Sequence, residues 1–280
     1  MKTYYMQLFR RVGRTALLVA AGGMLATACS DSEEPILQPN LPAVNGQNVR
    51  SITHLGGVTQ TYDWQLGYTG SRLTRGDGVV RDPSPAIDKS FSYTSSLTYQ
   101  PHGVTVSNSS SEKTQLSINA QGYIEQMTVN RNIYRFEYNS AGMLTAWQKI
   151  VFEDSFGQAQ QYRSSAVITY SGTDIQRIVY TDTDNSPVTL TFTPASEQNL
   201  NGLLPPTISR EMGCLGFEHL YYAGLLGRPT AHLVRSVSYA YTDASKNYVT
   251  DFEYSTQSGN TVLCNYHTPT GQVASISYAY

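Results

Sequence analysis

Cysteine and charge are both scarce in this 280-residue sequence. Besides Cys29, only Cys214 and Cys264 are present, and they could either form one disulfide or remain two buried free thiols. Lysine and arginine together number 19 against 21 aspartates and glutamates, and no stretch forms a basic patch. We therefore expect no nucleic acid partner, because nucleic acid binding needs clustered positive charge.

Motifs that carry catalytic chemistry are also missing from the sequence. It contains no G-x-S-x-G elbow, phosphate-binding loop, dinucleotide-binding glycine run or H-E-x-x-H zinc motif. The five histidines share no spacing typical of metal ligands, and they are His54, His102, His219, His232 and His267. The sequence therefore predicts a protein that is not an enzyme and has no catalytic residues, metal or cofactor.

No hydrophobic run is long enough to span a bilayer as a helix. The longest, Ala16–Ala26, follows a basic start and fits the core of a signal peptide over residues 1–28. The sequence Leu25-Ala26-Thr27-Ala28-Cys29 resembles a bacterial lipobox, although Ala26 stands where leucine is usual. We expect Cys29 to be lipidated, which makes the membrane a partner through the lipid anchor. An ordinary secretory signal is the alternative.

The residues after Cys29 suggest that the protein is exported to the cell surface. The acidic run Ser30–Glu34 looks like the surface-export signal of Bacteroidota lipoproteins, and the alternative is a solvated tether with no address. Prolines follow, so residues 29–45 are predicted to form a tether. The mature chain would hold 15 basic and 21 acidic residues. The expected location is the outer membrane, lipid-anchored, with the domain exposed on the cell surface.

Tyrosine, serine and threonine are abundant, and the chain from residue 46 repeats a hairpin pattern. Leu116–Ile124 and Phe136–Leu144 are its best copies, with an apolar strand end, an asparagine, a glycine and an apolar restart. Asparagine can start such a turn through its side chain, and glycine allows positive φ. We predict a single all-β domain over 46–280, an antiparallel meander that forms a strongly curved sheet or open barrel.

One stretch, 198–229, does not alternate like the strands around it. Within it, apolar residues follow helical spacing in two short runs, which predicts two short helices. We expect a short helical plug at about residues 205–227, inserted under the sheet. Its predicted buried residues are Ile208, Met212, Leu215, Phe217, Leu220 and Leu225.

The hairpin units resemble tyrosine–aspartate (YD) repeats, although the aspartate position holds Asn119 or Asn139 in the best copies. Asn48–Thr53, Asn201–Leu204 and Gly224–Arg228 add a closer resemblance. Together they look like a Bacteroidota outer-membrane lipoprotein family of unknown function with a porin-like β superfold and YD-like hairpins. The resemblance implies a β-fold with an inserted apolar segment and supplies no activity.

Candidate binding residues come from the insertion and from a later strand. Tyr221, Tyr222, Tyr239 and Tyr241 could stack on a glycan or lipid ligand, and the alternative is packing in the core. Glu211, Glu218 and His219 could form a buried carboxylate site, but we expect them to be the hydrophilic edges of the short helices.

Two functional interpretations follow. The first is a non-catalytic binding module for an apolar or glycan ligand, and the alternative is a structural or interaction module with no small-molecule ligand. A porin-like membrane barrel is disfavoured, because stretches such as Thr105–Ser111 lack the apolar outward face that a bilayer requires.

Overall fold

The computed structural model describes residues 48–56, 61–81, 91–100, 103–108, 113–129, 132–155, 158–258 and 260–280. The predicted signal peptide (1–28), the lipidated Cys29 and the predicted tether (29–45) lie outside the described residues.

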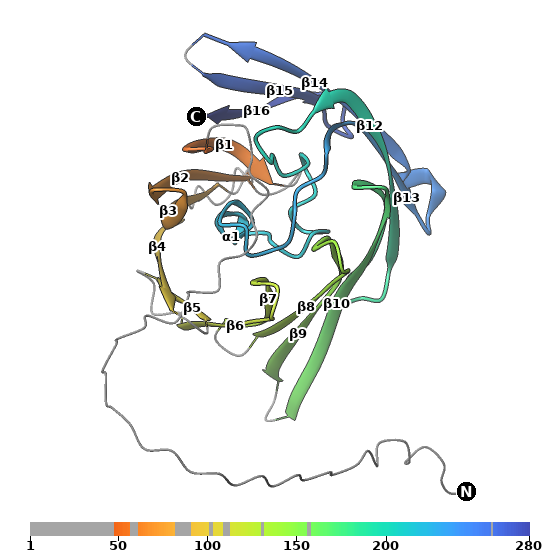
Figure 1. Cartoon of the computed structure of the whole chain (residues 1–280). Coiled ribbons are helices and arrows are strands. Elements are labelled where there is room, and N and C mark those ends of the chain that lie inside the picture. Colours follow the sequence, from red (N-terminus) through yellow and green to blue (C-terminus); the bar gives the residue numbers. More distant parts are fainter. Residues whose placement is uncertain are drawn as a thin grey trace, which may run out of the picture. The chain divides into compact units, whose positions relative to one another are not determined.

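Sixteen strands within the described residues form one closed, antiparallel barrel (Figure 1). Each strand pairs with its neighbours in the sequence. The strands are β1 (Ser51–Gly56), β2 (Thr61–Thr69), β3 (Arg72–Arg81), β4 (Phe91–Gln100), β5 (Gly103–Asn108), β6 (Lys113–Ile118), β7 (Ile124–Val129), β8 (Asn132–Tyr138), β9 (Leu144–Ser155), β10 (Gln158–Ser171), β11 (Asp174–Thr181), β12 (Pro187–Gln198), β13 (His232–Tyr241), β14 (Tyr248–Gln257), β15 (Thr261–His267) and β16 (Val273–Ala279).

The barrel closes where the first strand pairs with the last. Ile52 of β1 lies opposite Tyr278 of β16, and both side chains are buried. The predicted all-β meander is therefore confirmed, and the sheet closes into a barrel instead of leaving two free edges. Closure matters because a free sheet edge exposes unpaired backbone groups that can recruit other chains.

The predicted turn chemistry is confirmed at both of the best repeats. The Asn139 side-chain oxygen accepts hydrogen bonds from the backbone N–H groups of Ala141 and Met143, at 3.0 and 2.9 Å. Gly142 has a φ of 80°, a region that L side chains rarely adopt. Asn119 makes the same two bonds in the preceding copy, with the N–H groups of residues 121 and 123. Local sequence therefore sets these hairpins.

Alternation along each strand separates an apolar inner face from a polar outer face. In β5, Val104 and Val106 are buried whereas Thr105 and Ser107 are exposed. In β14, Thr250 and Phe252 are buried, whereas Val249, Asp251 and Glu253 are exposed. The barrel is thus built around an apolar interior.

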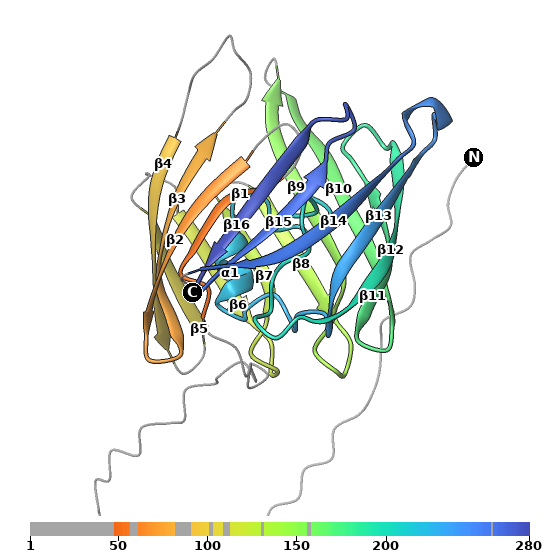
Figure 2. The same cartoon turned by 90° about the horizontal axis from the view of Figure 1, so that it is seen from above.

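The segment between β12 and β13 fills this interior. We call residues 199–231 the inserted segment, and Figures 1 and 2 show it inside the ring of strands. The predicted burial is confirmed for four of its six apolar residues. Ile208, Met212, Leu220 and Leu225 are buried, and Leu215 and Phe217 are partly buried against the core.

Only one of the two predicted helices is present. α1 (Glu218–Tyr222) is the α-helix of the inserted segment, whereas the predicted helix over 208–215 is a series of turns. Gly213 explains the difference, because its φ is +70° and a Cβ atom there would lie 2.6 Å from the Trp147 ring. The chain thus turns sharply against Trp147, and a helix cannot continue. Within the described residues, no helix is long and apolar enough to cross a membrane.

The inserted segment runs inside the barrel and contacts it near the hairpin end and near the other end of β11. At the end that carries the 119–123 and 139–143 turns, which we call the hairpin end, Asn199 N–H donates to the carbonyl of Ala231 at 2.8 Å. At the opposite end, the Arg210 guanidinium lies 5.0 Å from the centre of the Tyr180 ring and 3.9 Å from Asp182. The inserted segment therefore occupies the lumen from the hairpin end to the level at which β11 ends.

Cys214 of the inserted segment and Cys264 of β15 are both buried and free. Of the two possibilities open from the sequence, the structure therefore has two buried thiols and no bridge between them.

Candidate functional site

The four predicted binding tyrosines form two separate pairs. Tyr221 and Tyr222 lie on α1 with ring centroids 5.4 Å apart, and the Tyr222 hydroxyl accepts a hydrogen bond from Leu204 N–H at 3.2 Å. Tyr239 and Tyr241 lie on β13, and the Tyr239 hydroxyl is 3.0 Å from the Thr207 hydroxyl. The Tyr222 hydrogen bond links two parts of the inserted segment, and the Tyr239–Thr207 contact links that segment to the barrel wall. Ligand binding by the four tyrosines stays a prediction.

Glu211, Glu218 and His219 are not the hydrophilic edges that we expected. Their exposed fractions are 3%, 0% and 1%, because the segment that carries them lies inside the barrel instead of on its surface. Glu211 has its own partner, an ion pair of 2.8 Å between its Oε1 and Arg210 Nη2. The two carboxyl groups therefore have different partners.

Glu218 is a carboxyl group enclosed by the barrel. Trp64 Nε1–H of β2 donates to its Oε2 at 3.1 Å. Burial raises the pKa of Glu218 from 4.5 to about 7, and backbone N–H groups, Ser209 and Trp64 act in the opposite direction. The Ser209 hydroxyl is close to the carboxyl but outside hydrogen-bonding geometry, and Glu218 Oε1 has no partner among the described residues.

His219 packs against the ring of the same tryptophan. Its ring centroid is 4.6 Å from that of Trp64, and burial lowers the pKa of His219 to about 3, so the imidazole is neutral at physiological pH. Gly76 of β3 leaves the space for it, since a Cβ at residue 76 would lie 3.0 Å from the His219 Cβ. Among the described residues, no group of three or more His, Cys, Asp or Glu side chains could hold a metal ion.

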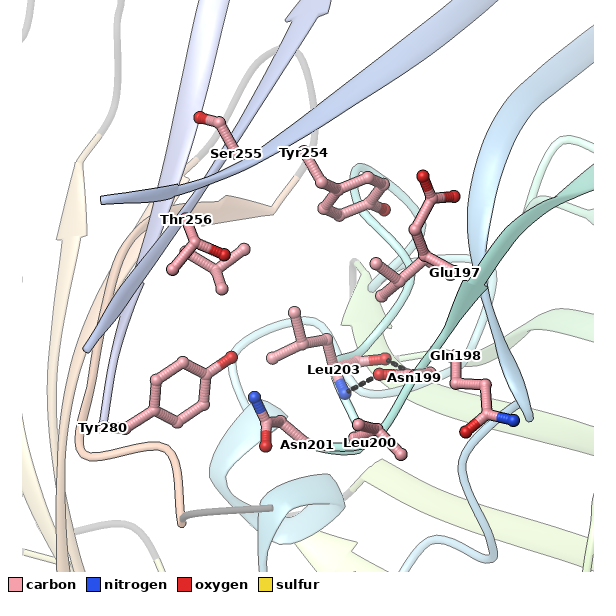
Figure 3. Close-up of a pocket in the computed structure, with 12 residues that line it drawn as sticks. Glu197, Gln198, Asn199, Leu200, Asn201, Leu203, Tyr254, Ser255, Thr256 and Tyr280 are labelled. Carbon is pink, nitrogen blue, oxygen red and sulfur yellow. Dashed lines mark hydrogen bonds between the residues drawn. The ribbon is translucent and has the colours of Figure 1, made fainter. Parts of the chain in front are cut away.

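A pocket of about 230 Å³ lies at the hairpin end of the barrel (Figure 3). It is formed where β12 enters the inserted segment and where β14, β15 and the C-terminal residue come together. Its lining residues are Glu197, Gln198, Asn199, Leu200, Asn201, Leu203, Leu233, Tyr254, Ser255, Thr256, Val262 and Tyr280.

Backbone and amide hydrogen bonds hold the walls of this pocket. Asn199 Nδ2 donates to the carbonyl of Leu203 at 2.9 Å, and Asn199 Oδ1 accepts from Leu203 N–H at 2.7 Å. On the other side, Tyr280 N–H donates to the carbonyl of Asn260 at 3.1 Å. The pocket is therefore preformed by the fold.

Sequence reasoning missed this pocket. Tyr280 was recognisable as the last residue of an aromatic stripe, but the stripe alone does not distinguish a core tyrosine from a pocket wall. The other lining residues come from three parts of the chain, which the meander of β12 to β15 and the inserted segment bring together.

Comparisons with known proteins point to one family and one fold. A family model described as a domain of unknown function (DUF4595) with porin-like fold matches residues 78–263. A porin-like protein from Bacteroides uniformis has a similar structure, with a TM-score of 0.60 and 18% sequence identity over 84% of this chain and 97% of its own. One from Bacteroides vulgatus has a TM-score of 0.49 and 12% identity, over 83% and 98%. No curated protein matches.

Proposed function

This chain belongs to the DUF4595 family of domains of unknown function with a porin-like fold, and we propose that it is a non-catalytic binding module held at the outer membrane by a lipid anchor. Its ligand is a small apolar or glycan molecule, bound at the hairpin end of the barrel. The pocket of about 230 Å³ at that end is the observation that carries this proposal.

The occupied lumen argues against a channel. A porin conducts through a polar, water-filled interior, whereas this barrel has an apolar inner face covered by the inserted segment. Leu204, Ile208 and Leu220 of that segment are fully buried. The free space at the hairpin end is then the natural place for a ligand.

The outer face argues for an anchor instead of a membrane-spanning barrel. A transmembrane barrel needs an apolar band on its outward residues, and each lysine or arginine near the bilayer midplane costs ~2–4 kcal/mol. In the described strands, outward residues include Arg135, Glu137 and Arg177, together with many serines and threonines. Such a surface favours water, so attachment through acyl chains on Cys29 is the consistent arrangement.

Replacing Cys29 by alanine is expected to release the protein from the membrane. Acyl chains contribute ~0.8 kcal/mol per buried CH₂, and this variant would have none. Fractionation of cells that express either form, followed by immunoblotting, measures the change. Ser32→Ala keeps the cysteine and should remain in the membrane fraction. A Cys29→Ala variant that sediments with membranes as completely as the natural chain would exclude lipid anchoring.

Protease added to intact cells is expected to degrade the domain, because the Ser30–Glu34 run resembles a surface-export signal. The loss is followed by immunoblotting, with a periplasmic protein as the control for an intact outer membrane. Protection that ends only when the outer membrane is opened would instead put the domain in the periplasm.

The alternative is a structural or interaction module with no small ligand. The same occupied lumen supports it, because the inserted segment then serves only as the core of the barrel. The two proposals differ in whether the hairpin-end pocket binds a ligand, and the experiment in the next subsection separates them.

A further inference from the structure

Two tyrosines from different strands form opposite walls of the hairpin-end pocket. Tyr254 belongs to β14 and Tyr280 follows β16, and Figure 3 shows both side chains directed toward the same space. Aliphatic side chains complete the apolar part of the wall. Among them, Leu200 is 52% exposed and puts an apolar surface at the rim.

Polar groups are distributed around these apolar walls. The lining includes the polar residues Thr256 and Asn201, whereas the Ser255 hydroxyl accepts a hydrogen bond from Gln257 Nε2 at 3.1 Å. The Tyr280 hydroxyl is buried beside the Asn201 side chain, which lies close enough to oppose the effect of burial on the Tyr280 pKa. A ligand hydroxyl could join these two polar groups in a hydrogen-bond network.

The charges of the lining select against acidic ligands. Glu197 is the one ionisable acid among the residues that line the pocket, and this set includes no lysine, arginine or histidine. A phosphate, a fatty-acid carboxylate or an acidic sugar would therefore meet a carboxylate with no cation to balance it.

The size of the pocket selects a short ligand group. About 230 Å³ is below the ~300–1,000 Å³ typical of pockets for drug-sized ligands. A single ring with hydroxyls around its edge and C–H groups on its faces matches both the tyrosine walls and the polar groups. A long acyl chain would leave the amides and hydroxyls without partners.

We infer that the hairpin-end pocket binds one uncharged sugar residue of a glycan between Tyr254 and Tyr280. This inference rests on the proposed binding function and names the ligand class and the residues that recognise it.

The test uses the full-length protein, solubilised in detergent, and isothermal titration calorimetry. The probes are neutral gluco-, manno- and xylo-oligosaccharides, with oligogalacturonate as the acidic comparison and octanoate as the apolar one. At least one neutral oligosaccharide should bind. Tyr280→Phe, which removes only the hydroxyl, should weaken that binding roughly threefold to tenfold. Tyr254→Ala should weaken it by more than tenfold, whereas Tyr134→Phe, at a β8 tyrosine outside the pocket, should leave it unchanged.

Native mass spectrometry of the protein from its own host accompanies the titrations, because it detects a retained ligand of any class. A neutral oligosaccharide that binds equally to all three tyrosine variants would contradict the pocket assignment. Binding or retention only of an acidic or apolar ligand would overturn the sugar inference and leave the binding function in place. No binding and no retained ligand would overturn both, in favour of the structural module.

Discussion

Leu220→Asp is expected to unfold the barrel. Leu220 lies on α1, in the middle of the inserted segment, and is fully buried. Loss of a buried leucine side chain alone costs ~2–5 kcal/mol. A buried carboxylate without a partner adds several kcal/mol more. Because net stabilities are ~5–15 kcal/mol, the change removes most or all of the stability. Thermal unfolding followed by circular dichroism measures it.

Val249→Asp is the matched control for this prediction. Val249 lies on the outer face of β14 and is 59% exposed, so the same new carboxylate would remain in water. The expected cost is below ~1 kcal/mol, or a few degrees in melting temperature for a domain of this size. If the two variants melt together within a few degrees of the natural chain, the inserted segment does not support the barrel.

Glu218→Gln is expected to stabilise the protein at pH 8 far more than at pH 5. The pKa of Glu218 is raised by burial to about 7 from 4.5, so the folded state holds a proton that the unfolded state has lost. The contribution of Glu218 to the free energy of unfolding is fully present below pH 4.5 and is lost as the pH rises through 7. The loss corresponds to roughly 3 kcal/mol. Glutamine keeps an acceptor for Trp64 and carries no charge, so it avoids the loss.

Urea unfolding of both proteins at the two pH values tests this prediction. His219 acts in the opposite direction, because its lowered pKa removes stability as the pH falls below 6.5. That effect is present in both proteins and cancels in their difference. Glu253→Gln, at an exposed position of β14, serves as the control. An equal effect of Glu218→Gln at pH 5 and pH 8 would mean that the carboxyl is not held protonated inside the barrel.

The parts of the fold that the sequence predicted are those set by short-range chemistry. Asn139 and Gly142 specify their hairpin within a few residues, so the antiparallel order of successive strands follows from the repeated hairpin pattern. Closure depends on Ile52 meeting Tyr278 at the other end of the chain, and no local signal reports such a pairing. The turn at Gly213 likewise depends on the Trp147 ring, which belongs to a distant strand.

The interior site was harder to predict than the strands. Glutamate and histidine are usually exposed, so polar edges were the reasonable expectation for Glu218 and His219. Their burial depends on Trp64 and Gly76 of β2 and β3, which supply a hydrogen bond and the necessary space. The hairpin-end pocket depends in the same way on segments that meet only in the finished barrel, and sequence periodicity contains no information about that meeting.

The pairing of β1 with β16 also brings the two ends of the described barrel together. Arg50 N–H donates to the carbonyl of Ala279 at 2.7 Å, so Arg50 and Ala279 both lie at the hairpin end. The chain could therefore begin at a different strand without changing the order of the strands around the barrel. A circular permutant with a short linker from Tyr280 to Asn48 and new termini at the exposed Asn185 would keep every strand pairing. Its termini would then emerge from the end opposite the pocket, which gives an engineer control over the direction in which the pocket faces.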